Sequence, residues 1–407
     1  MPYYPKYSIT NQILKNVGTI DAARQVITSA PLVPAWEKRF QTEARAKIIH
    51  HGTHLEGNDL NFDEVEEILS PDPVSSGPGL NRKPEQSSSW DAEGGRPGPT
   101  EKTIIARDRD IAEIINYRSV MDYLDTLAPK GSDLDGRAQP ADSKAGRSDP
   151  KGYIVLNRHI LMEMHRLTVK GLLPAEESGA YRTVKVVIRN TETREISFRP
   201  PGPLDVPFLV DELFEWLASK DGLEVHPLLR AGILHYELVR IHPFTDGNGR
   251  TARAMALLLL FLEGYEVKKF FALEEYYDSH PEEYYAALQS VVGTGELTNW
   301  LEYFTLGIAI EFNRIKTLVQ KLSLDLHLKS TIGGRQITLT ARQIKLVEYI
   351  ERHGEISMGN VRELLPDVSE DTILRDLRDL VSKNLLVKKG STKGTRYYLQ
   401  SGDSHEF

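Results

Sequence analysis

The sequence contains no cysteine and no long apolar run. The absence of cysteine excludes disulfide bonds and thiolate metal sites, and it suits a reducing compartment. The longest apolar run, residues 255–262, is too short to span a bilayer, and the start of the chain, MPYYPKYSIT, lacks a charged-then-apolar signal pattern. The GxxxxGK[ST], HExxH and GxSxG motifs are also absent, so the common nucleotide, zinc and hydrolase motifs are excluded. We therefore expect a cytoplasmic protein that has no membrane partner.

The composition is that of an ordinary globular protein. Hydrophobic residues make up 40% of the 407 residues, and a chain of this length is expected to form two or three domains. The formal net charge of −8 provides no global attraction to nucleic acid or to anionic membranes. Binding to either would therefore depend on a local cluster of basic residues.

Residues 242–253, HPFTDGNGRTAR, lie between two apolar segments with helical spacing. His242 precedes a proline, which disfavours helical backbone, so we expect it at a helix end. Gly247 and Gly249 flank Asn248 in a run that can adopt positive φ and expose backbone amides to an anion. The next helix begins within this run, so the positive end of its dipole faces the same place. This arrangement favours a bound phosphate.

The same stretch carries the side chains that phosphate chemistry needs. His242 has a pKa near neutrality and can accept a proton from a hydroxyl. Asp246 is the one carboxylate of the loop and suits a Mg²⁺ that is bound mainly by substrate phosphates. Arg250 and Arg253 are three residues apart on the first helical turn and can bind further phosphates. The alternative is a glycine-rich turn between core helices, with arginines in surface salt bridges.

This stretch resembles the signature of the Fic family, HPFx[D/E]GNGRxxR, at every fixed position. The resemblance implies transfer of AMP from ATP to a target protein, with His242 deprotonating a Ser, Thr or Tyr hydroxyl. Asp246 would hold Mg²⁺, and Phe244 would anchor the loop in the core. Relatives that phosphorylate instead carry lysine at the position of Gly249, so the glycine argues against that variant.

The resemblance also implies the composition of the nucleotide site. His242, Asn248 and Arg250 are expected to be catalytic. The adenine ring needs an aromatic platform, for which the tyrosines of residues 276–285 and Asn299 are candidates, although most of these aromatics also fit a core. The residues expected to contact ATP are Gly247, Asn248, Gly249, Arg250, Arg253, Tyr277 and Asn299.

A second motif precedes the core. Many Fic proteins carry an inhibitory motif, [S/T]xxxE[G/N], on a helix whose glutamate pairs with the second arginine of the signature. Glu56 and Gly57 match its end, on a helix expected near residues 45–57, but Gly52 occupies the Ser/Thr position and Thr53 stands one residue late. The resemblance implies that Glu56 pairs with Arg253 and blocks the γ-phosphate site. The alternative is a helix end with a solvated glutamate.

The N-terminal region, residues 1–130, shows helical spacing that is interrupted by a Pro-, Gly- and Ser-rich insertion at 71–100, which we expect to be disordered. A new helix is expected to begin near Asn61. The histidines at 50, 51 and 54 have no accompanying carboxylate cluster in the sequence. We therefore expect surface or capping roles for them and no metal site.

The catalytic core is expected at residues 151–315. Within it, residues 183–201 alternate β-branched and polar residues around NTET, which predicts a β-hairpin. Fic proteins have such a hairpin, the flap, which holds the target segment beside the base by strand addition. A hairpin that merely covers the core is the alternative.

The last segment, residues 335–400, predicts a winged helix with three short helices and a two-stranded wing. Its third helix mixes Arg375 and Arg378 with two aspartates, which suits DNA poorly, whereas the wing is basic, with Lys388, Lys389, Lys393 and Arg396. Both DNA binding and protein docking remain open, because the fold does not decide the function.

The sequence thus predicts a mainly α fold: a Fic-type helical core with a β-hairpin flap, N-terminal helices and a C-terminal winged helix. The predicted function is that of a protein adenylyltransferase with ATP as substrate, Mg²⁺ as cofactor and Glu56 as inhibitor. Its partner is a hydroxyl-bearing target protein or the chain itself, and formation of a homodimer is left open. The alternatives are a nucleotide-sensing transcription regulator, a scaffold held inactive by Glu56, or a Fic enzyme that uses another nucleotide or removes AMP.

Overall fold

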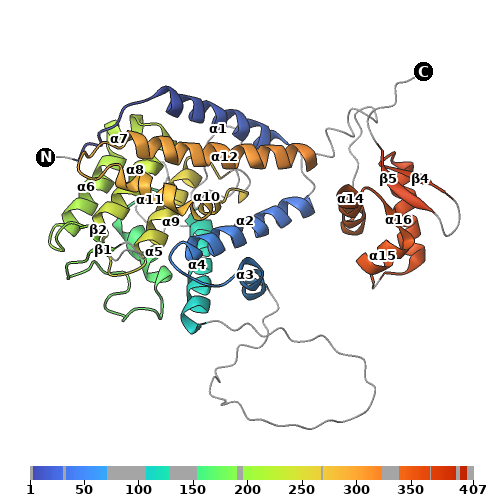
Figure 1. Cartoon of the computed structure of the whole chain (residues 1–407), viewed down its shortest axis with the longest axis horizontal. Helices are drawn as coiled ribbons and strands as arrows, with labels where there is room; N and C mark the ends of the chain where they lie inside the picture. Colours follow the sequence, from blue (N-terminus) through green and yellow to red (C-terminus); the bar gives the residue numbers. More distant parts are fainter. Residues whose placement is uncertain are drawn as a thin grey trace, which may run out of the picture. The chain divides into compact units, whose positions relative to one another are not determined.

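A computed structural model describes residues 3–30, 34–70, 107–127, 154–189, 196–266, 269–322, 339–366, 368–390 and 395–400 (Figure 1). The chain forms two compact units, Met1–Asp21 with Thr42–Phe312, and Ala22–Gln41 with Asn313–Phe407. This division differs from the predicted boundaries at 130, 151 and 335, because most of the N-terminal region packs within the same unit as the core. The predicted insertion at 71–100 lies outside the described residues.

The part of the chain before residue 322 is built almost entirely of helices. They are α1 (Asn11–Ser29), α2 (Pro34–His54), α3 (Phe62–Leu69), α4 (Asp108–Leu127), α5 (Arg158–Thr168), α6 (Val206–Ala218), α7 (Lys220–Glu224), α8 (Pro227–Ile241), α9 (Asn248–Leu262), α10 (Leu273–Ser279), α11 (Pro281–Gln289) and α12 (Thr298–Leu322). The start of α3 is capped by Asn61 in a capping box, as expected from the sequence. No helix within the described ranges is long and apolar enough to cross a membrane.

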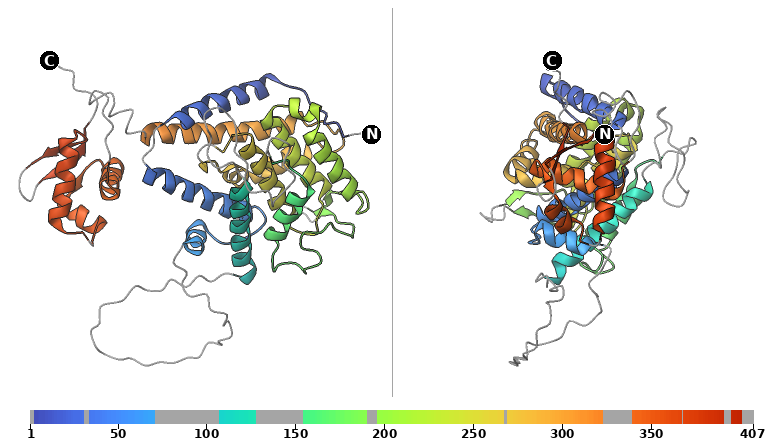
Figure 2. Two further views of the ribbon diagram at one scale, coloured as in Figure 1. Left: turned by 180° about the vertical axis from the view of Figure 1, so that it is seen from behind. Right: turned by 90° about the vertical axis from the view of Figure 1, so that its right-hand side faces the viewer.

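Helix α9 is the centre of the first unit. Its residues from Asn248 to Phe261 are buried apart from Gly249, and it packs against α8, α5 and α4 (Figures 1 and 2). A helix that is buried on all sides needs partners on every side, and from Ala254 to Leu262 this helix is entirely apolar. The loop that joins α8 to α9 is residues 242–247, so the packing of these two helices against each other fixes both ends of the predicted active-site loop.

The predicted flap is a short two-stranded antiparallel sheet. Strand β1 (Ile188–Arg189) pairs with β2 (Ile196–Phe198), with Ile188 opposite Phe198. The turn predicted at NTET lies outside the described residues. The structure therefore contains the hairpin, and its strands are shorter than the alternating pattern of residues 183–201 indicates.

The C-terminal domain has the predicted winged-helix fold, with one additional strand. Its elements are α14 (Ala341–His353), β3 (Ile356–Ser357), α15 (Met358–Leu364), α16 (Glu370–Ser382), β4 (Leu386–Lys389) and β5 (Arg396–Leu399). The strand order is β3-β5-β4, all antiparallel, around a core that includes Leu346, Ile373 and Leu377. The mainly α fold class with a C-terminal winged helix is thus confirmed.

Candidate active site

His242 ends helix α8 in a left-handed conformation, with φ of 50°, and its backbone N–H still donates to Leu238 O at 3.0 Å. Its Nδ1 atom lies 3.4 Å from Val239 O, a contact that assigns the ring proton to Nδ1 and leaves the Nε2 lone pair open. Burial lowers the pKa of His242, and this outweighs the Val239 contact and the charge of Glu56, which raise it. The imidazole is therefore neutral near pH 7 and able to accept a proton.

The side chain of Asn248 closes the loop that follows His242. Its Oδ1 atom accepts from Phe244 N–H and its Nδ2 atom donates to Phe244 O, both at 2.9 Å, and it is 4% exposed. Because both polar side-chain atoms are used within the loop, Asn248 can contact a ligand only through its backbone amide. Phe244 is fully buried, as expected for an anchor of this loop.

His165, from α5, supports the same loop and was not singled out from the sequence. Its Nε2 atom lies 3.0 Å from Asp246 O, and its Nδ1 atom accepts from Gly179 N–H at 3.0 Å, which places the proton on Nε2. Its ring stacks on Phe244 with centroids 3.7 Å apart. Burial lowers the pKa of His165 to about 4, so it stays neutral and keeps this pattern of hydrogen bonds.

The positive φ predicted for the glycines of this loop is present at Gly247 but not at Gly249. Gly247 has φ of 73° and precedes α9, and a Cβ atom there would lie 2.8 Å from Val169 Cγ1. Gly249 already has helical backbone. The first amides of α9, from Asn248 onward, have no partner one turn earlier and point out of the helix start. Phosphate oxygens can accept from them.

Two charged side chains, Asp246 and Arg250, lie next to the start of α9. Arg250 is 2% exposed, and its Nη2 atom lies 3.7 Å from Asp246 Oδ1 while its Nη1 atom lies 3.3 Å from Glu113 Oε1. Nη1 thus meets Glu113 as an ion pair without a hydrogen bond, and among the described residues Nε also has no hydrogen-bond partner. A buried guanidinium with unused donors is suited to grip an anion.

The carboxylate of Asp246 fits the role of a metal ligand. It is 36% exposed, and its Oδ2 atom already accepts from a cationic group, Arg109 Nη2, at 2.7 Å. Burial would raise the pKa of Asp246, but the bond from Arg109 and the charge of Arg250 outweigh it and lower the pKa. The described residues contain no group of three or more His, Asp or Glu that could hold a metal ion. A Mg²⁺ here would thus take Asp246 and, for its other ligands, substrate phosphates and water.

The predicted ion pair between Glu56 and Arg253 is present. Arg253 Nη2 donates to Glu56 Oε1 and to Gly52 O, both at 2.8 Å, and the side chain of Arg253 is only 2% exposed. The Glu56 carboxylate lies against the first turn of α9, since a Cβ atom on Gly249 would be 2.0 Å from Glu56 Oε1. It thus occupies the space in front of the predicted phosphate site.

The structure explains the missing Ser or Thr at position 52. A Cβ atom on Gly52 would lie 2.6 Å from Cε1 of Tyr117, a fully buried residue of α4. Thr53 does not replace the missing hydroxyl, because its Oγ1 atom donates to Ile49 O and lies 3.0 Å from His50 O within its own helix. Tyr117 therefore fills the position that the family motif gives to Ser or Thr.

The histidines near the end of α2 do not lie free on the surface. His51 Nδ1 and His54 Nδ1 lie 2.7 Å and 2.8 Å from the carboxylate of Asp278 at the end of α10, and His50 is buried. The expected surface role fits His54, whose side chain is 52% exposed, but not buried His50, and the carboxylate of Asp278 comes from more than 220 positions away. These contacts hold the end of α2 against α10.

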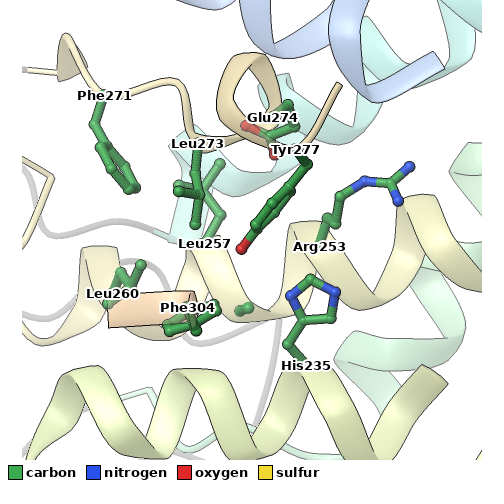
Figure 3. Close-up of a pocket in the computed structure, with 10 residues that line it drawn as sticks. His235, Arg253, Leu257, Leu260, Phe271, Leu273, Glu274, Tyr277 and Phe304 are labelled. Atoms are coloured by element: carbon green, nitrogen blue, oxygen red, sulfur yellow. The ribbon is translucent and has the colours of Figure 1, made fainter. Parts of the chain in front are cut away.

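Tyr277 and Asn299, the two adenine candidates among the expected ATP contacts, have different surroundings. Tyr277 is 1% exposed and lines a cavity about the size of one water molecule, together with His235, Arg253 and Glu274 (Figure 3). This cavity is too small for adenine. Asn299 is exposed on the first turn of α12. Burial raises the pKa of Glu274 to about 7, despite the opposing charge of Arg253.

Arg182 is a further site residue that the sequence analysis missed. It is 3% exposed, its Nε atom donates to His242 O at 2.7 Å, and its backbone N–H donates to Pro243 O at 2.9 Å. Its remaining donors bond Val184 O and Pro201 O on either side of the flap. A buried arginine that bonds only backbone carbonyls has no charge partner, and no sequence pattern reveals such a role.

Two family models match the chain. The model of the Fic/DOC family matches residues 155–260, and that of a DeoR-like helix-turn-helix domain matches residues 342–390. The protein adenylyltransferase Fic of Culex quinquefasciatus is 26% identical over 251 residues, which are 62% of this chain and 39% of that protein. The protein of the same name from Nematostella vectensis is 36% identical over 120 residues, which are 29% of this chain and 26% of that protein. The chain thus spans less than half the length of these relatives.

Solved structures show the same fold. A Fic family protein from Desulfovibrio desulfuricans aligns over 99% of this chain and 100% of that chain, with a TM-score of 0.60 at 20% identity. A Fic domain containing signaling protein from Bacteroides thetaiotaomicron aligns over 77% of this chain and 97% of that chain, with a TM-score of 0.51 at 19% identity. At these identities the likeness concerns the fold alone.

Proposed function

We propose that this chain, which contains a Fic/DOC domain and a DeoR-like helix-turn-helix domain, is a protein adenylyltransferase that moves AMP from ATP to a Ser, Thr or Tyr hydroxyl. The names of its relatives support this class of reaction. The observation that carries the proposal is the position of neutral His242 next to the open start of α9, with unused donors on buried Arg250.

The proposed reaction is an in-line displacement. The Nε2 atom of His242 takes the proton of the target hydroxyl, whose oxygen attacks the α-phosphorus of ATP. The bond from that phosphorus to the oxygen bridging to the β-phosphate breaks, and pyrophosphate leaves. The amides at the start of α9 and the guanidinium of Arg250 stabilise the charge on the phosphates. Asp246 would hold Mg²⁺, which supplies further neutralisation of the phosphate charge when bound.

We further propose that Glu56 inhibits this reaction. Its carboxylate lies against Gly249 and uses Arg253, the cation that would otherwise receive the γ-phosphate. A negative group at this place repels ATP and leaves the γ-phosphate without its partner. Loss of the carboxylate should therefore raise AMP transfer without changing the chemistry at His242.

The test compares wild type, Glu56→Gly and Glu56→Gly/His242→Ala with ATP labelled on the α-phosphate, in Mg²⁺, read by intact mass. One added AMP on the single variant and none on the double variant is the expected result. Parallel reactions with ATP labelled on the γ-phosphate detect phosphate transfer. Label from the γ-phosphate on the protein, or AMP transfer that survives His242→Ala, would contradict the proposal. Equal labelling of wild type would retain the enzyme and remove Glu56 as inhibitor.

A second function, DNA binding through the C-terminal domain, is favoured by the charges of α16. Asp376 pairs with Arg342 and Asp379 with Lys383, whereas Arg375 and Arg378 are exposed. The expectation that mixed charge makes α16 unsuitable for DNA does not take this pairing into account. The two unneutralised arginines lie on the outer face of the helix and can meet phosphates.

The DNA hypothesis predicts binding of duplex DNA that weakens steeply as salt rises. The double variant Arg375→Gln/Arg378→Gln should weaken this binding about tenfold or more. The slope of log affinity against log salt concentration should become shallower by the equivalent of about two phosphate contacts. Arg362→Gln is the matched control, because Arg362 is paired with Glu370 on the same domain. Equal weakening by both variants, or binding that does not depend on salt, would argue against α16 as the contact.

A further inference from the structure

Arg109, at the start of α4, forms an ion pair with the predicted metal ligand. Its Nη2 atom lies 2.7 Å from Asp246 Oδ2, although the two residues are 137 positions apart in the sequence. Both side chains reach solvent, with 56% and 36% of their surfaces exposed. The carboxylate that should hold Mg²⁺ is thus already neutralised by a cation of the chain itself.

Arg109 has a second carboxylate that can keep it in place. Its Nε atom donates to Glu113 Oε1 at 3.1 Å, one turn further along α4. Glu113 is 6% exposed and anchored by Asn58 Nδ2 at 3.1 Å. The guanidinium can therefore release Asp246 while its Nε atom stays bonded to Glu113.

We propose that Arg109 is a resident cation that competes with the metal for Asp246 and is displaced when metal-bound nucleotide enters. This inference rests on the proposed function, because it takes Asp246 to be the metal ligand. Without metal, Arg109 cancels the charge of Asp246 and lowers its repulsion of the phosphates. With metal, the ion pair must open before the carboxylate can coordinate. The first effect strengthens ATP binding without Mg²⁺ and the second weakens it with Mg²⁺, so the two affinities become more similar.

The experiment measures ATP binding by calorimetry, in excess Mg²⁺ and in EDTA, with the full chain carrying Glu56→Gly/His242→Ala. This background opens the γ-phosphate site and prevents turnover. The quantity compared is the ratio of the dissociation constant in EDTA to that in Mg²⁺. Arg109→Gln should raise this ratio roughly three- to tenfold, the range expected for loss of an exposed ion pair and of the charge it cancels.

Arg107→Gln is the matched control. Arg107 lies two residues earlier and pairs with Asp59 and Asp110 but not with Asp246, so the ratio should stay unchanged. Asp246→Asn should bring the ratio close to one, with or without Arg109. A ratio that Arg109→Gln leaves unchanged overturns the proposal, since a simple phosphate clamp would weaken binding equally in both conditions.

Different results would contradict the competition at Asp246 and the proposed function. If ATP binds and Glu56→Gly transfers AMP while the ratio does not respond to Arg109→Gln, the competition is refuted and the proposed function stands. If Asp246→Asn retains the full effect of Mg²⁺, Asp246 is not the ligand and the competition is also refuted. If no variant binds ATP in either condition, both the inference and the proposed function fall.

Discussion

At the scale of single residues, the close approach of Gly52 to Tyr117 explains why the end of α2 carries glycine at position 52. The Gly52 carbonyl accepts from Arg253, and the tyrosine ring fills the space beside it. We predict that Gly52→Ala lowers the free energy of unfolding by about 1–3 kcal/mol, because the added methyl overlaps a fully buried ring. Chemical denaturation measures this change.

The matched control for this substitution is Gly18→Ala in α1, where a Cβ atom meets no atom within 4 Å. It should leave stability unchanged or raise it by about 0.5–1 kcal/mol. The double variant Gly52→Ala/Tyr117→Leu should recover part of the lost stability relative to the sum of its single variants. Strict additivity would mean that the ring is not what excludes a side chain at position 52.

The pH dependence of AMP transfer follows from the lowered pKa of His242. Burial lowers this pKa and outweighs the charge of Glu56, which raises it. His242 therefore becomes protonated, and inactive as a base, only at a pH below the ordinary histidine pKa of about 6.5. For Glu56→Gly at saturating ATP, we expect a rate that is constant from about pH 7 to 8 and decreases in acid. Wild type should lose activity at a higher pH than Glu56→Gly, and the reverse order would exclude this electrostatic coupling.

The roles of single residues could be predicted only where the motif is local. The signature residues from His242 to Arg253 lie within one loop and one helical turn, so their spacing alone indicated a phosphate site. Arg109 and Tyr117 act through contacts with partners 137 and 65 positions away, for which the sequence carries no spacing rule. Asn248 was predicted to contact the nucleotide, and nothing in the sequence indicated that its side chain closes the loop by bonding Phe244.

At the scale of secondary-structure elements, α2 is held against α10 by charged contacts. Lys47 Nζ lies 3.0 Å from Glu275 Oε1, and Asp278 accepts from both His51 and His54 close to Glu56. The pKa of Asp278 would be raised by burial but is lowered by its two histidine bonds, so it remains ionised. We therefore expect this attachment to limit how often Glu56 moves away from Arg253.

We predict that Asp278→Asn raises AMP transfer by the otherwise wild-type chain about fivefold, because the end of α2 loses two charge-assisted bonds. Added to Glu56→Gly, the same substitution should have no further effect, since no inhibitory carboxylate is left to release. Glu282→Gln, on the exposed side of α11, is the control and should change neither rate. An increase that persists in the Glu56→Gly background would show that Asp278 acts on catalysis by another route.

Elements with strong end signals were predicted well, and short strands were not. Helix α3 begins next to Asn61, as its sequence indicates, and the proline after His242 ends α8. Strand β3 has only two residues and exists through its pairing with β5, so no local pattern could reveal it. A positive φ was predicted for Gly249 because it is glycine. Its backbone is helical instead, because α9 begins one residue earlier, at Asn248.

At the scale of the whole molecule, the division of the chain is the feature least accessible from sequence. The unit that contains the C-terminal domain also includes Ala22–Gln41, and Phe40 packs against the core of that domain. Composition can predict an insertion, but it does not reveal which helix packs against the core of a domain that is distant in the sequence. The fold class was predictable because helical spacing and the wing pattern are local, and the grouping into units depends on packing.

Stability of the folded chain should fall in mild acid. Burial lowers the pKa values of His50 and His165 to about 4 and of His235 to about 3, whereas unfolded histidine titrates near 6.5. Between these values the unfolded chain binds the protons, so stability decreases as the pH falls through 6.5. Glu274 acts in the opposite sense, because its raised pKa of about 7 lets the folded chain hold one proton. Three histidines outweigh one carboxyl.

For these four groups, the unfolded chain binds about two more protons than the folded chain, three minus one. Between about pH 6.5 and 4.5, each of these protons lowers the free energy of unfolding by roughly 1.4 kcal/mol per pH unit. Tryptophan fluorescence should therefore record a Tm several degrees lower at pH 5.5 than at pH 7. His165→Gln removes one of the titrating groups and should make this pH dependence shallower, whatever its effect on Tm at pH 7. His159→Gln, an exposed histidine on the same helix, should leave the slope unchanged. A slope that His165→Gln does not alter would mean that acid acts through the surface carboxylates rather than through the buried imidazole of His165, which bonds the loop after His242.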